Sequence, residues 1–580
     1  MAGALLGIDV GGTFTDAVLL DDGRMTTAKV PTEPAQEQSV LAAARAVDAR
    51  NVERFTHGTT VATNALLERK GARTAFVATS GFEHLLHLRR QSRRSLYRLC
   101  DDWPAPLVPL ERCVGVRGRL GPDDELEPVE PSSLPELDAD AVAICLLHAY
   151  RDPAHERAVA EEVRRRLPRA HVVASHEIAP EFREYERAST TVVDAYLGPV
   201  MSRYLRALAG ACSDAGLPEP LVMRSSGGVA SAWQAADHPA LVLVSGPAAG
   251  TVGAALAARR AGFESALALD MGGTSTDVSL VLDGSVARAS ARDVAGFPLR
   301  LPTVDLHTIG AGGGSIAARD AGGALQVGPA SAGADPGPAC YGRGGTEPTV
   351  TDANLLLGRL PGRIAGGIEL DVDAARRALG DLDPADVVAA VNAEMLRALR
   401  VVSVERGHDP RELALVAFGG AGPLHACELA EQLEIEAVVV PEAAGVLSAL
   451  GLVAGEERRD HVRSYLVPLE EAGELPREGE ADLRYAGQSF ELTVALQPEL
   501  ATAFHSAHEE RYGFSEPERT VELVAVRTAD VKPPPRVDLP ANGARTERGP
   551  ALVELDGSTL WIPPGWVGAR DGPTWTVTRE

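Results

Sequence analysis

The stretch that decides the fold covers residues 270–277 and reads Asp270-Met271-Gly272-Gly273-Thr274-Ser275-Thr276-Asp277. Apolar runs precede it at 266–269 and follow it at 278–282, which predicts the turn of a β-hairpin. The same pattern occurs near the N-terminus as Asp9-Val10-Gly11-Gly12-Thr13-Phe14-Thr15-Asp16. The two copies begin 261 residues apart and match at six of their eight positions. This duplication predicts two related halves.

The residue types in the repeated turn are suited to holding phosphate. Paired glycines allow the backbone to approach a ligand closely and to take positive φ, so that successive N–H groups point at one anion. Threonine hydroxyls add donors, and an aspartate at a strand end is suited to the hydrated Mg²⁺ that a phosphate carries. One Gly-Gly turn alone is most often only a turn. Two copies predict two lobes that close on one nucleoside triphosphate.

The predicted site follows from these turns. Asp9 and Asp270 are predicted to hold the water shell of Mg²⁺, the alternative being that either is only a turn residue. The phosphates of ATP are assigned to the glycines and threonines of both turns, which are Gly11, Gly12, Thr13, Thr15, Gly272, Gly273, Thr274 and Thr276.

Five further segments make the chain resemble a known family. They are HGTTVATNA at 57–65, REYER at 183–187, GAGGGS at 310–315, ADPGPACYG at 334–342 and FGGAGPLH at 418–425. With the duplicated turns, they resemble the hydantoinase A / 5-oxoprolinase family, within the actin, sugar-kinase and Hsp70 superfamily. The resemblance implies an α/β protein with a two-lobed, actin-like (ribonuclease H-like) ATPase fold and a C-terminal β-rich domain. It also implies that four glycines border the adenosine of ATP, namely Gly312, Gly313, Gly420 and Gly422.

Length and composition bound the remaining possibilities. At 580 residues the chain is too long for one core, and we expect an N-terminal lobe at 1–215, a second lobe at 216–460 and a β-rich domain at 461–580. The net charge of −25 argues against a nucleic-acid partner.

The apolar stretches are too short to span a bilayer, and no basic region opens the sequence, so we expect a cytoplasmic protein. Its six scattered cysteines are expected to be reduced.

Three local predictions bear on the site. A helix is predicted over 85–99, and it would place Arg90 and Arg93 on one side. We assign Arg90 a catalytic role towards the charge of the transferred phosphate, with Arg187 as a third candidate; the alternative is a solvated helix face. Residues 100–137 are expected to be an irregular insertion. A helix is expected to begin in the segment 310–315, which does not fit the dinucleotide pattern because Ser315 replaces its last glycine.

The resemblance implies an ATP-dependent hydrolase subunit. It would phosphorylate a cyclic amide (a hydantoin, 5-oxoproline or another lactam) for ring opening with a hydantoinase B-type subunit. The chain has no room for that half, so a hetero-oligomer is implied. Two alternatives remain open: a subunit of an acetone/acetophenone-type carboxylase, and a non-catalytic actin-like nucleotide-binding protein. Bicarbonate-dependent ATP turnover would identify the first, and ATP-dependent filaments seen by light scattering would identify the second.

Overall fold

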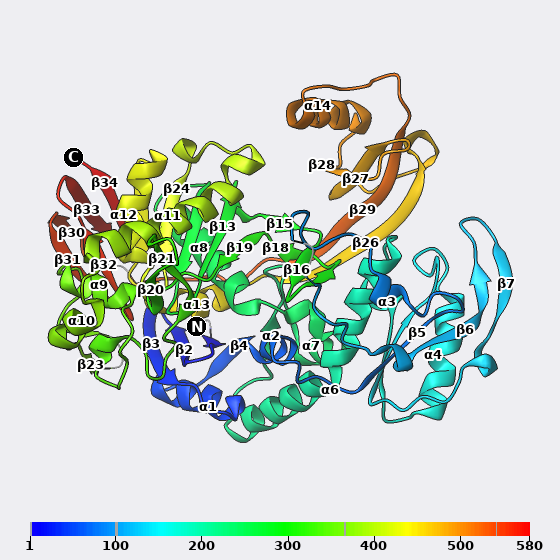
Figure 1. The fold of residues 1–580 in the computed structure, drawn as a ribbon, viewed down its shortest axis with the longest axis horizontal. Coiled ribbons are helices and arrows are strands. Elements are labelled where there is room, and N and C mark those ends of the chain that lie inside the picture. Colours follow the sequence, from blue (N-terminus) through cyan, green and yellow to red (C-terminus); the bar gives the residue numbers. More distant parts are fainter. Residues whose placement is uncertain (1–2, 99–101, 365–366, 541) are drawn as a thin grey trace.

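The computed structural model describes residues 3–98, 102–364, 367–540 and 542–580. Its first lobe is built around a sheet in which five strands run in the order β3-β2-β1-β4-β10 (Figure 1). Strand β1 pairs antiparallel with β2 and parallel with β4. These strands are β1 (Ala4–Val10), β2 (Phe14–Asp21), β3 (Arg24–Pro31), β4 (Val52–Thr59) and β10 (Leu221–Met223).

The second lobe repeats this arrangement. Its first strand, β12, pairs antiparallel with β13 and parallel with β24, while β19 and β25 extend the two sides. Every residue of β24 and β25 is buried, as expected for interior parallel strands with a continuous apolar sequence. The strands are β12 (Ala266–Met271), β13 (Thr276–Leu282), β19 (Leu306–Ile309), β24 (Ala414–Phe418) and β25 (Ala437–Pro441).

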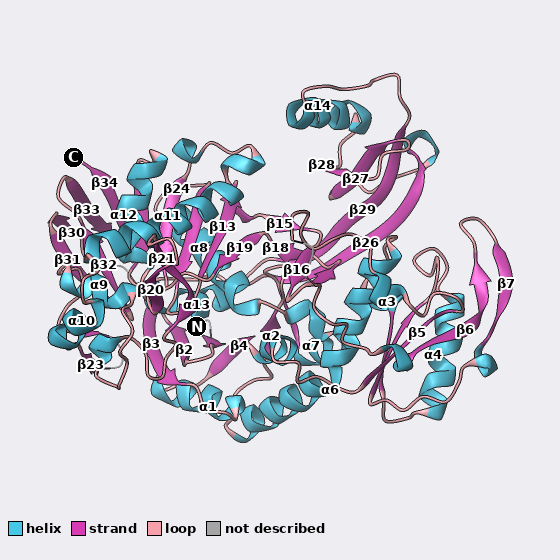
Figure 2. Ribbon diagram, in the orientation of Figure 1, coloured by secondary structure: helices cyan, strands magenta, loops and turns pink. Residues whose placement is uncertain are grey.

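In both sheets the third strand lies beside the second and the second beside the first. The first strand lies beside the fourth, and the fourth beside the fifth. This duplicated order, with helices packed around the sheets, confirms the predicted two-lobed α/β fold (Figure 2). The helices are α1 (Gln36–Ala46), α2 (Val61–Leu67), α3 (Leu85–Leu88), α4 (Ala154–Arg166), α5 (Ser175–Ile178), α6 (Glu184–Asp214), α7 (Ala232–Asp237), α8 (Ser245–Arg260), α9 (Val350–Leu356), α10 (Val372–Leu379), α11 (Pro384–Val402), α12 (Gly422–Leu433), α13 (Leu447–Val453) and α14 (Leu500–Tyr512).

The strand-rich C-terminal segment extends both lobes. Four of its strands lengthen the first sheet and form the arm at the upper right of Figure 1, together with α14. Three others continue the second sheet from β25 in the order β34-β33-β30. The strands of the expected C-terminal domain thus belong to the sheets of both lobes, and the expected domain bounds stay a prediction. The strands are β26 (Glu457–Pro468), β27 (Glu480–Tyr485), β28 (Leu492–Ala495), β29 (Val521–Lys532), β30 (Arg545–Arg548), β33 (Trp566–Asp571) and β34 (Thr574–Arg579).

Helix α13 lies between the lobes, packed against both α8 and β1. Two glycines make this packing possible. A Cβ atom on Gly451 would lie 1.9 Å from the carbonyl oxygen of Ala249 in α8, and one on Gly7 would lie 2.1 Å from that of Ala449. No side chain fits in either gap, because such contacts are far inside van der Waals separation.

A third sheet sits beside the first lobe in the order β7-β6-β5-β8-β9. It corrects the expectation of an irregular segment at 100–137, because residues 113–130 form the hairpin of β6 and β7. The acidic sequence of β7 fits its place as an exposed edge strand. The strands are β5 (Thr74–Thr79), β6 (Cys113–Leu120), β7 (Glu125–Glu130), β8 (Ala141–Cys145) and β9 (His171–Ala174).

Two further expectations concern cysteines and membranes. The five cysteines in the described residues are buried and form no disulfide, while Cys100 lies outside those residues. Within the described ranges, no helix combines the length and the apolar character that crossing a bilayer requires.

Candidate functional site

In the first lobe, a row of charged side chains crosses three neighbouring strands. The register places Asp9 of β1 opposite Asp16 of β2, and Asp16 opposite Lys29 of β3, so all three point from one face of the sheet. The Nζ atom of Lys29 lies 2.5 Å from Oδ1 of Asp16. On the other side of Asp9 lies Gly58, where a Cβ atom would come within 2.3 Å of the Asp9 carboxylate.

The second lobe repeats the row at the corresponding positions. Asp270 of β12 is opposite Asp277 of β13, which is opposite Thr308 of β19 and accepts a hydrogen bond from its hydroxyl. Gly419 directly follows Phe418, the register partner of Asp270, and a Cβ atom on Gly419 would lie 2.4 Å from Oδ1 of Asp270. Each lobe therefore presents an aspartate pair with a glycine beside the first member.

The two rows face each other closely enough for their charges to interact. The pKa of Asp9 is raised to about 7, mainly by burial and then by the charge of Asp16, while the charge of Lys29 acts in the opposite direction. Burial also raises the pKa of Asp270 to about 8, with contributions from Asp277 and then from Asp9 across the lobes. Such a concentration of carboxylates with raised pKa values is typical of a site that binds a cation.

The two glycine turns share one backbone geometry. The N–H of Gly11 donates to the carbonyl of Phe14 at 3.0 Å, and the N–H of Gly272 donates to that of Ser275 at the same distance. The second glycine of each turn, Gly12 or Gly273, faces open space. The expectation of positive φ at these four glycines is wrong. Gly12 and Gly273 instead leave room beside the turn.

The threonines of the turns divide into two pairs. Thr13 and Thr274 are exposed at the tips, where their hydroxyls are free to meet a phosphate. Thr15 and Thr276 are fully buried, and their hydroxyls already have protein partners. Thr15 is 3.0 Å from the hydroxyl of Thr32, and Thr276 donates to the carbonyl of Ala311 at 2.6 Å. The inner pair therefore fixes the turns, and the direct contact of Thr15 and Thr276 with phosphate stays a prediction.

The glycine-rich segment 310–314 packs directly on the second turn. The N–H groups of Gly313 and Gly314 donate to the carbonyls of Gly272 and Gly273, at 3.0 and 2.7 Å. A Cβ atom on Gly312 would lie 2.7 Å from the backbone of that turn. The predicted helix in 310–315 is wrong: this loop ends in the strand β20 (Ser315–Arg319), because its N–H groups bond to the turn.

A second glycine loop follows β24 and reaches the same aspartate. Gly420 is exposed with open space around it, whereas Gly422 begins helix α12 beneath the end of β12. The hydroxyl of Ser558 donates to the carbonyl of Gly419 at 2.9 Å and so ties the loop to the C-terminal segment. The adenosine contacts assigned to Gly312, Gly313, Gly420 and Gly422 stay a prediction.

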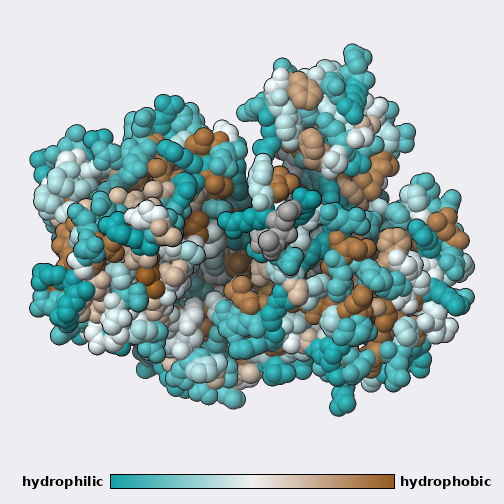
Figure 3. All heavy atoms as spheres, in the orientation of Figure 1, coloured by the Kyte–Doolittle hydropathy of each residue, from teal (hydrophilic) through white to brown (hydrophobic). Residues whose placement is uncertain are grey.

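The residues present fit a nucleotide that carries a metal ion. Oδ1 of Asp9 is buried and has no hydrogen-bond partner among the described residues. No three His, Cys, Asp or Glu side chains of that same part of the chain gather closely enough to bind a metal directly. The buried, unpartnered Oδ1 of Asp9 suits a hydrogen bond from a water of a hydrated Mg²⁺. Figure 3 shows the surface hollowed near the centre of the view, in the region where Figure 1 labels β13 and β19.

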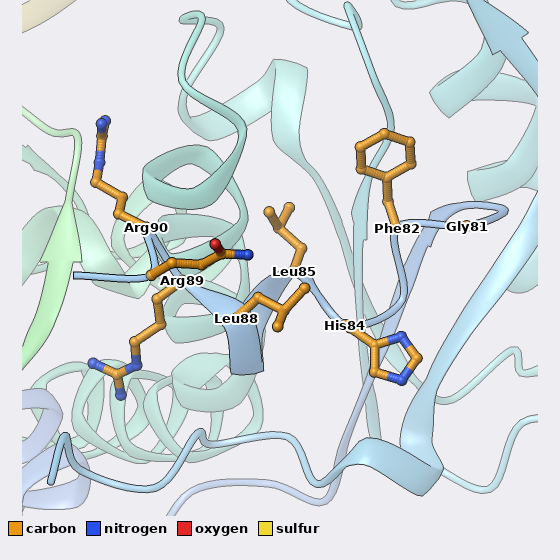
Figure 4. A pocket seen from close by; sticks show the side chains of 8 residues that line it. Gly81, Phe82, His84, Leu85, Leu88, Arg89 and Arg90 are labelled. Carbon is orange, nitrogen blue, oxygen red and sulfur yellow. The ribbon is translucent and has the colours of Figure 1, made fainter. Parts of the chain in front are cut away.

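Arg90 does not lie beside the two glycine turns. The predicted helix over 85–99 is wrong over residues 89–98 (Leu99 lies outside the described residues), because α3 ends at Leu88 and the backbone turns left-handed at Arg89 and Gln91. Arg90 is at the edge of a hollow of about 340 Å³, and Figure 4 shows its side chain pointing away from that of Arg89. It forms an ion pair with Glu186 of α6. In Figure 1, α3 belongs to the body of the third sheet, apart from both hairpins; the catalytic role of Arg90 stays a prediction.

The other two arginines also differ from the expectation. Arg93 lies in the irregular segment after α3, so the two arginines do not share a helix face. Arg187 is fully buried in α6 and donates to the carbonyl of Leu146 at 2.7 Å. Its guanidinium also stacks over the ring of Tyr150. Arg187 therefore supports the junction of α6 with the third sheet.

Sequence reasoning missed Lys29 and the adjacent glycines of the two rows. The signal for Lys29 was present in the dipeptide Asp22-Gly23, which is typical of a two-residue hairpin turn. A two-residue turn at that position fixes the register of β2 with β3 and places residue 29 opposite residue 16. Gly58 and Gly419 had no comparable local signal, because their neighbours come from distant strands.

Comparison with known proteins identifies the family to which the chain belongs. The two lobes and their paired hairpins define a nucleotide-binding class of α/β protein. Residues 5–167 match the family model of the hydantoinase/oxoprolinase N-terminal region, and residues 187–461 match that of hydantoinase/oxoprolinase. The chain is 33% identical to caprolactamase subunit alpha of Pseudomonas jessenii over 97% of both chains. It therefore belongs to the hydantoinase/oxoprolinase family.

Two further similarities are informative. The crystal structure of the ATP-dependent caprolactamase from Pseudomonas jessenii superposes with a TM-score of 0.88 at 30% identity, covering 99% of each chain. The gamma subunit of acetophenone carboxylase from Aromatoleum aromaticum is 34% identical over 77% of this chain and 67% of its own. The family thus includes relatives named for two different reactions.

The pKa values of Asp9 and Asp270 predict how stability changes with pH. In the unfolded chain these carboxyls lose their protons near pH 3.8, whereas the folded protein keeps them to about pH 7 and 8. The unfolded state therefore binds fewer protons, and stability falls as pH rises through this interval, by up to about 1.4 kcal/mol per pH unit for each group. We expect the melting temperature of the nucleotide-free protein to fall from pH 6.5 to 8.5. Asp9→Asn with Asp270→Asn should flatten the profile, and an unchanged slope would contradict the assignment.

Proposed function

We propose that the chain is an ATP-dependent, lactam-activating subunit that phosphorylates a cyclic amide so that its ring can be opened. The observation that carries the proposal is the pair of facing rows at Asp9 and Asp270, each beneath a glycine turn with open space above it. A duplicated phosphate-binding turn supplies what phosphoryl transfer needs most, which is positioning and neutralisation of charge. The similarity to a caprolactamase subunit supports a lactam as the acceptor.

The reaction balances as follows. The carbonyl oxygen of the amide forms a bond to the γ-phosphorus of ATP, while the bond from that phosphorus to the β–γ bridging oxygen breaks and its electron pair leaves with ADP. The amide nitrogen loses its proton to solvent. Water then adds to the activated carbon and the C–N bond breaks, with the nitrogen taking up a proton from solvent, which leaves an acyl phosphate. A second water hydrolyses the acyl phosphate and releases phosphate. The sum is lactam, ATP and two waters giving amino acid, ADP and phosphate.

The residues of this chain act on binding and charge. Thr13 and Thr274, with the backbone N–H groups of the turns, would donate to phosphate oxygens. Asp9 and Asp270 would accept hydrogen bonds from the waters of Mg²⁺, which neutralises charge on the β- and γ-phosphates when bound. The buried Thr15 and Thr276 would keep both turns in place during the reaction.

A second candidate function is an ATP-dependent carboxylase subunit of the acetone/acetophenone type. It is favoured by the 34% identity to the acetophenone carboxylase gamma subunit. The same site would then phosphorylate an enol oxygen or bicarbonate. ATP hydrolysis should depend on bicarbonate and a ketone if this function holds, and on a lactam without bicarbonate if the first one does.

The proposal predicts that the isolated chain is a poor amidase. Relatives named as alpha and gamma subunits support an assembly with other chains, and we propose a hydantoinase B-type subunit as the partner. We expect purified chain to show ATPase stimulated by a lactam but little ring opening. Product formation by liquid chromatography, with phosphate release measured in parallel, tests this. Efficient ATP-coupled ring opening by the chain alone would refute the partner requirement.

The substrate screen should use caprolactam, 5-oxoproline and a hydantoin, with linear amides as matched controls. A lactam that stimulates ATP turnover above the linear amide identifies the acceptor class. Bicarbonate-dependent stimulation by acetone or acetophenone would replace the lactam proposal with the carboxylase one.

A further inference from the structure

Lys29 is set apart from the other lysines of this chain. The sequence holds 56 lysines and arginines, of which only three, Lys29, Lys70 and Lys532, are lysines. The side chains of Lys70 and Lys532 are 75% and 79% exposed, whereas that of Lys29 is 22% exposed. An arginine-rich chain therefore has its sheltered lysine at the first glycine turn.

The surroundings of Lys29 hold its ammonium group at the site. It is in ion-pair contact with Asp16 at 2.5 Å, and its Nζ atom lies 5.5 Å from the ring centroid of Phe14, a residue of the turn itself. The C-terminal segment closes the other side, because a Cβ atom on Gly557 would lie 3.4 Å from the Cε atom of Lys29. Nearby, the hydroxyl of Thr27 donates to Asp556 at 3.3 Å.

The positive charge of Lys29 beside the carboxylates of the two rows suits an anionic ligand that carries a metal ion. Its positive charge acts on Asp9 in the same lobe and on Asp270 in the other. A lysine ammonium has three donors on a flexible stem, so it can keep one contact with Asp16 and offer another N–H to a phosphate oxygen. Asp16 thus orients the ammonium group of Lys29. The flexible stem of the lysine allows that group to stay in contact with a phosphate as its charge changes.

We propose that Lys29 is a catalytic residue, whose ammonium donates to an oxygen of the γ-phosphate and stabilises charge as the bond to ADP breaks. The inference rests on the proposed function and names the cation that sequence reasoning assigned to Arg90. Lys29 keeps its proton throughout and forms no covalent bond. Its contribution is largest in the transition state, where charge shifts to the leaving oxygen.

The scarcity of lysine makes a direct test simple. The full chain is treated with an amine-selective reagent, and the labelling rates of the three lysines are followed by mass spectrometry. We expect a non-hydrolysable ATP analogue with Mg²⁺ to slow the labelling of Lys29 by about tenfold or more, and Mg·ADP to slow it much less. Lys70 and Lys532 are internal controls whose rates should not change. Equal labelling of Lys29 with and without a bound analogue would overturn the inference.

Variants separate a catalytic role from a structural one. Lys29→Gln should bind Mg·ADP within about twofold of wild type, but bind the ATP analogue about tenfold more weakly and turn over ATP on the order of 10²-fold more slowly. Lys29→Arg keeps the charge and should recover part of the analogue binding, while Lys70→Gln should match wild type. Equal weakening of ADP and analogue in Lys29→Gln, with a lowered melting temperature, would indicate a structural ion pair only and overturn the inference.

The same titrations keep the two proposals distinguishable. If the wild-type chain binds no Mg·nucleotide, the proposed function itself fails. If the wild-type chain binds the analogue and Lys29→Gln binds it equally well, the proposed function stands and only the role of Lys29 is refuted.

Discussion

Replacing Asp270 by asparagine is expected to abolish Mg²⁺-dependent nucleotide turnover, by on the order of 10³-fold. The amide keeps the size of the side chain but carries no charge for the water shell of the metal. Because burial raises the pKa of Asp270 to about 8, a neutral group there removes a desolvation cost, so the variant should fold at least as well as wild type. We also expect the affinity for Mg·ATP to fall. A steady-state ATPase assay measures turnover, calorimetric titration measures Mg·ATP affinity, and a thermal melt measures stability.

The matched control for this variant is Asp283→Asn. Asp283 lies in the turn after β13, is exposed and has a φ of 49°, a conformation that asparagine also tolerates. Its replacement changes the same charge in the same lobe at a distance from the rows, and should leave nucleotide affinity unchanged. Unaltered Mg·ATP affinity in Asp270→Asn would end the assignment of Asp270.

Adding one methyl group at Gly451 is expected to lower the stability of the fold strongly. The new Cβ atom of Gly451→Ala would lie 1.9 Å from the carbonyl oxygen of Ala249, so α13 must move away from α8. Overpacking of this kind costs about 1–3 kcal/mol, and more when backbone is the obstacle. Because α13 also packs on β1, the shift should reach Asp9 and weaken nucleotide binding as well.

Gly210→Ala is the control, because the same substitution there is expected to raise the stability of the protein and not to lower it. Gly210 is exposed within helix α6, and apart from the neighbouring backbone of that helix no atom lies within 4 Å of the position of its Cβ atom. Alanine there should stabilise the helix by about 0.5–1 kcal/mol. Thermal melts of both variants test the packing. A Gly451→Ala melting temperature equal to that of wild type would contradict the close approach of α8 and α13.

The parts of the fold that the sequence predicted are those set by neighbouring residues. The hairpins at Asp9–Asp16 and Asp270–Asp277 form from adjacent apolar runs and a glycine turn, so pattern alone identified them. The alternation of side chains and the length of a turn also fix the register of a hairpin. The two-residue turn at Asp22-Gly23 therefore predicts that Lys29 lies opposite Asp16, although the sequence analysis did not draw that conclusion.

The parts that the sequence did not predict depend on distant partners. The segment after Leu88 has helical spacing, but Arg89 stacks on Trp103 and Arg90 pairs with Glu186, and these contacts favour a left-handed turn over continuation of α3. The loop at Gly312 is held by N–H bonds to the second turn, which no local pattern encodes. In the same way, no periodicity in 461–580 indicates which sheet each strand joins.

The interleaved strands of the C-terminal segment have a consequence during synthesis on the ribosome. Strand β25 pairs with β24 on one side and with β34 on the other, and β34 covers residues 574–579. At ordinary elongation rates, a nascent chain that has released Pro441 waits on the order of ten seconds for that second neighbour. Through this interval Val438, Val439 and Val440 present an apolar, unpaired strand edge, the kind of template on which chains aggregate. We therefore expect the partly synthesised chain to be more prone to aggregate through β25 than the chain in which β34 has paired with it.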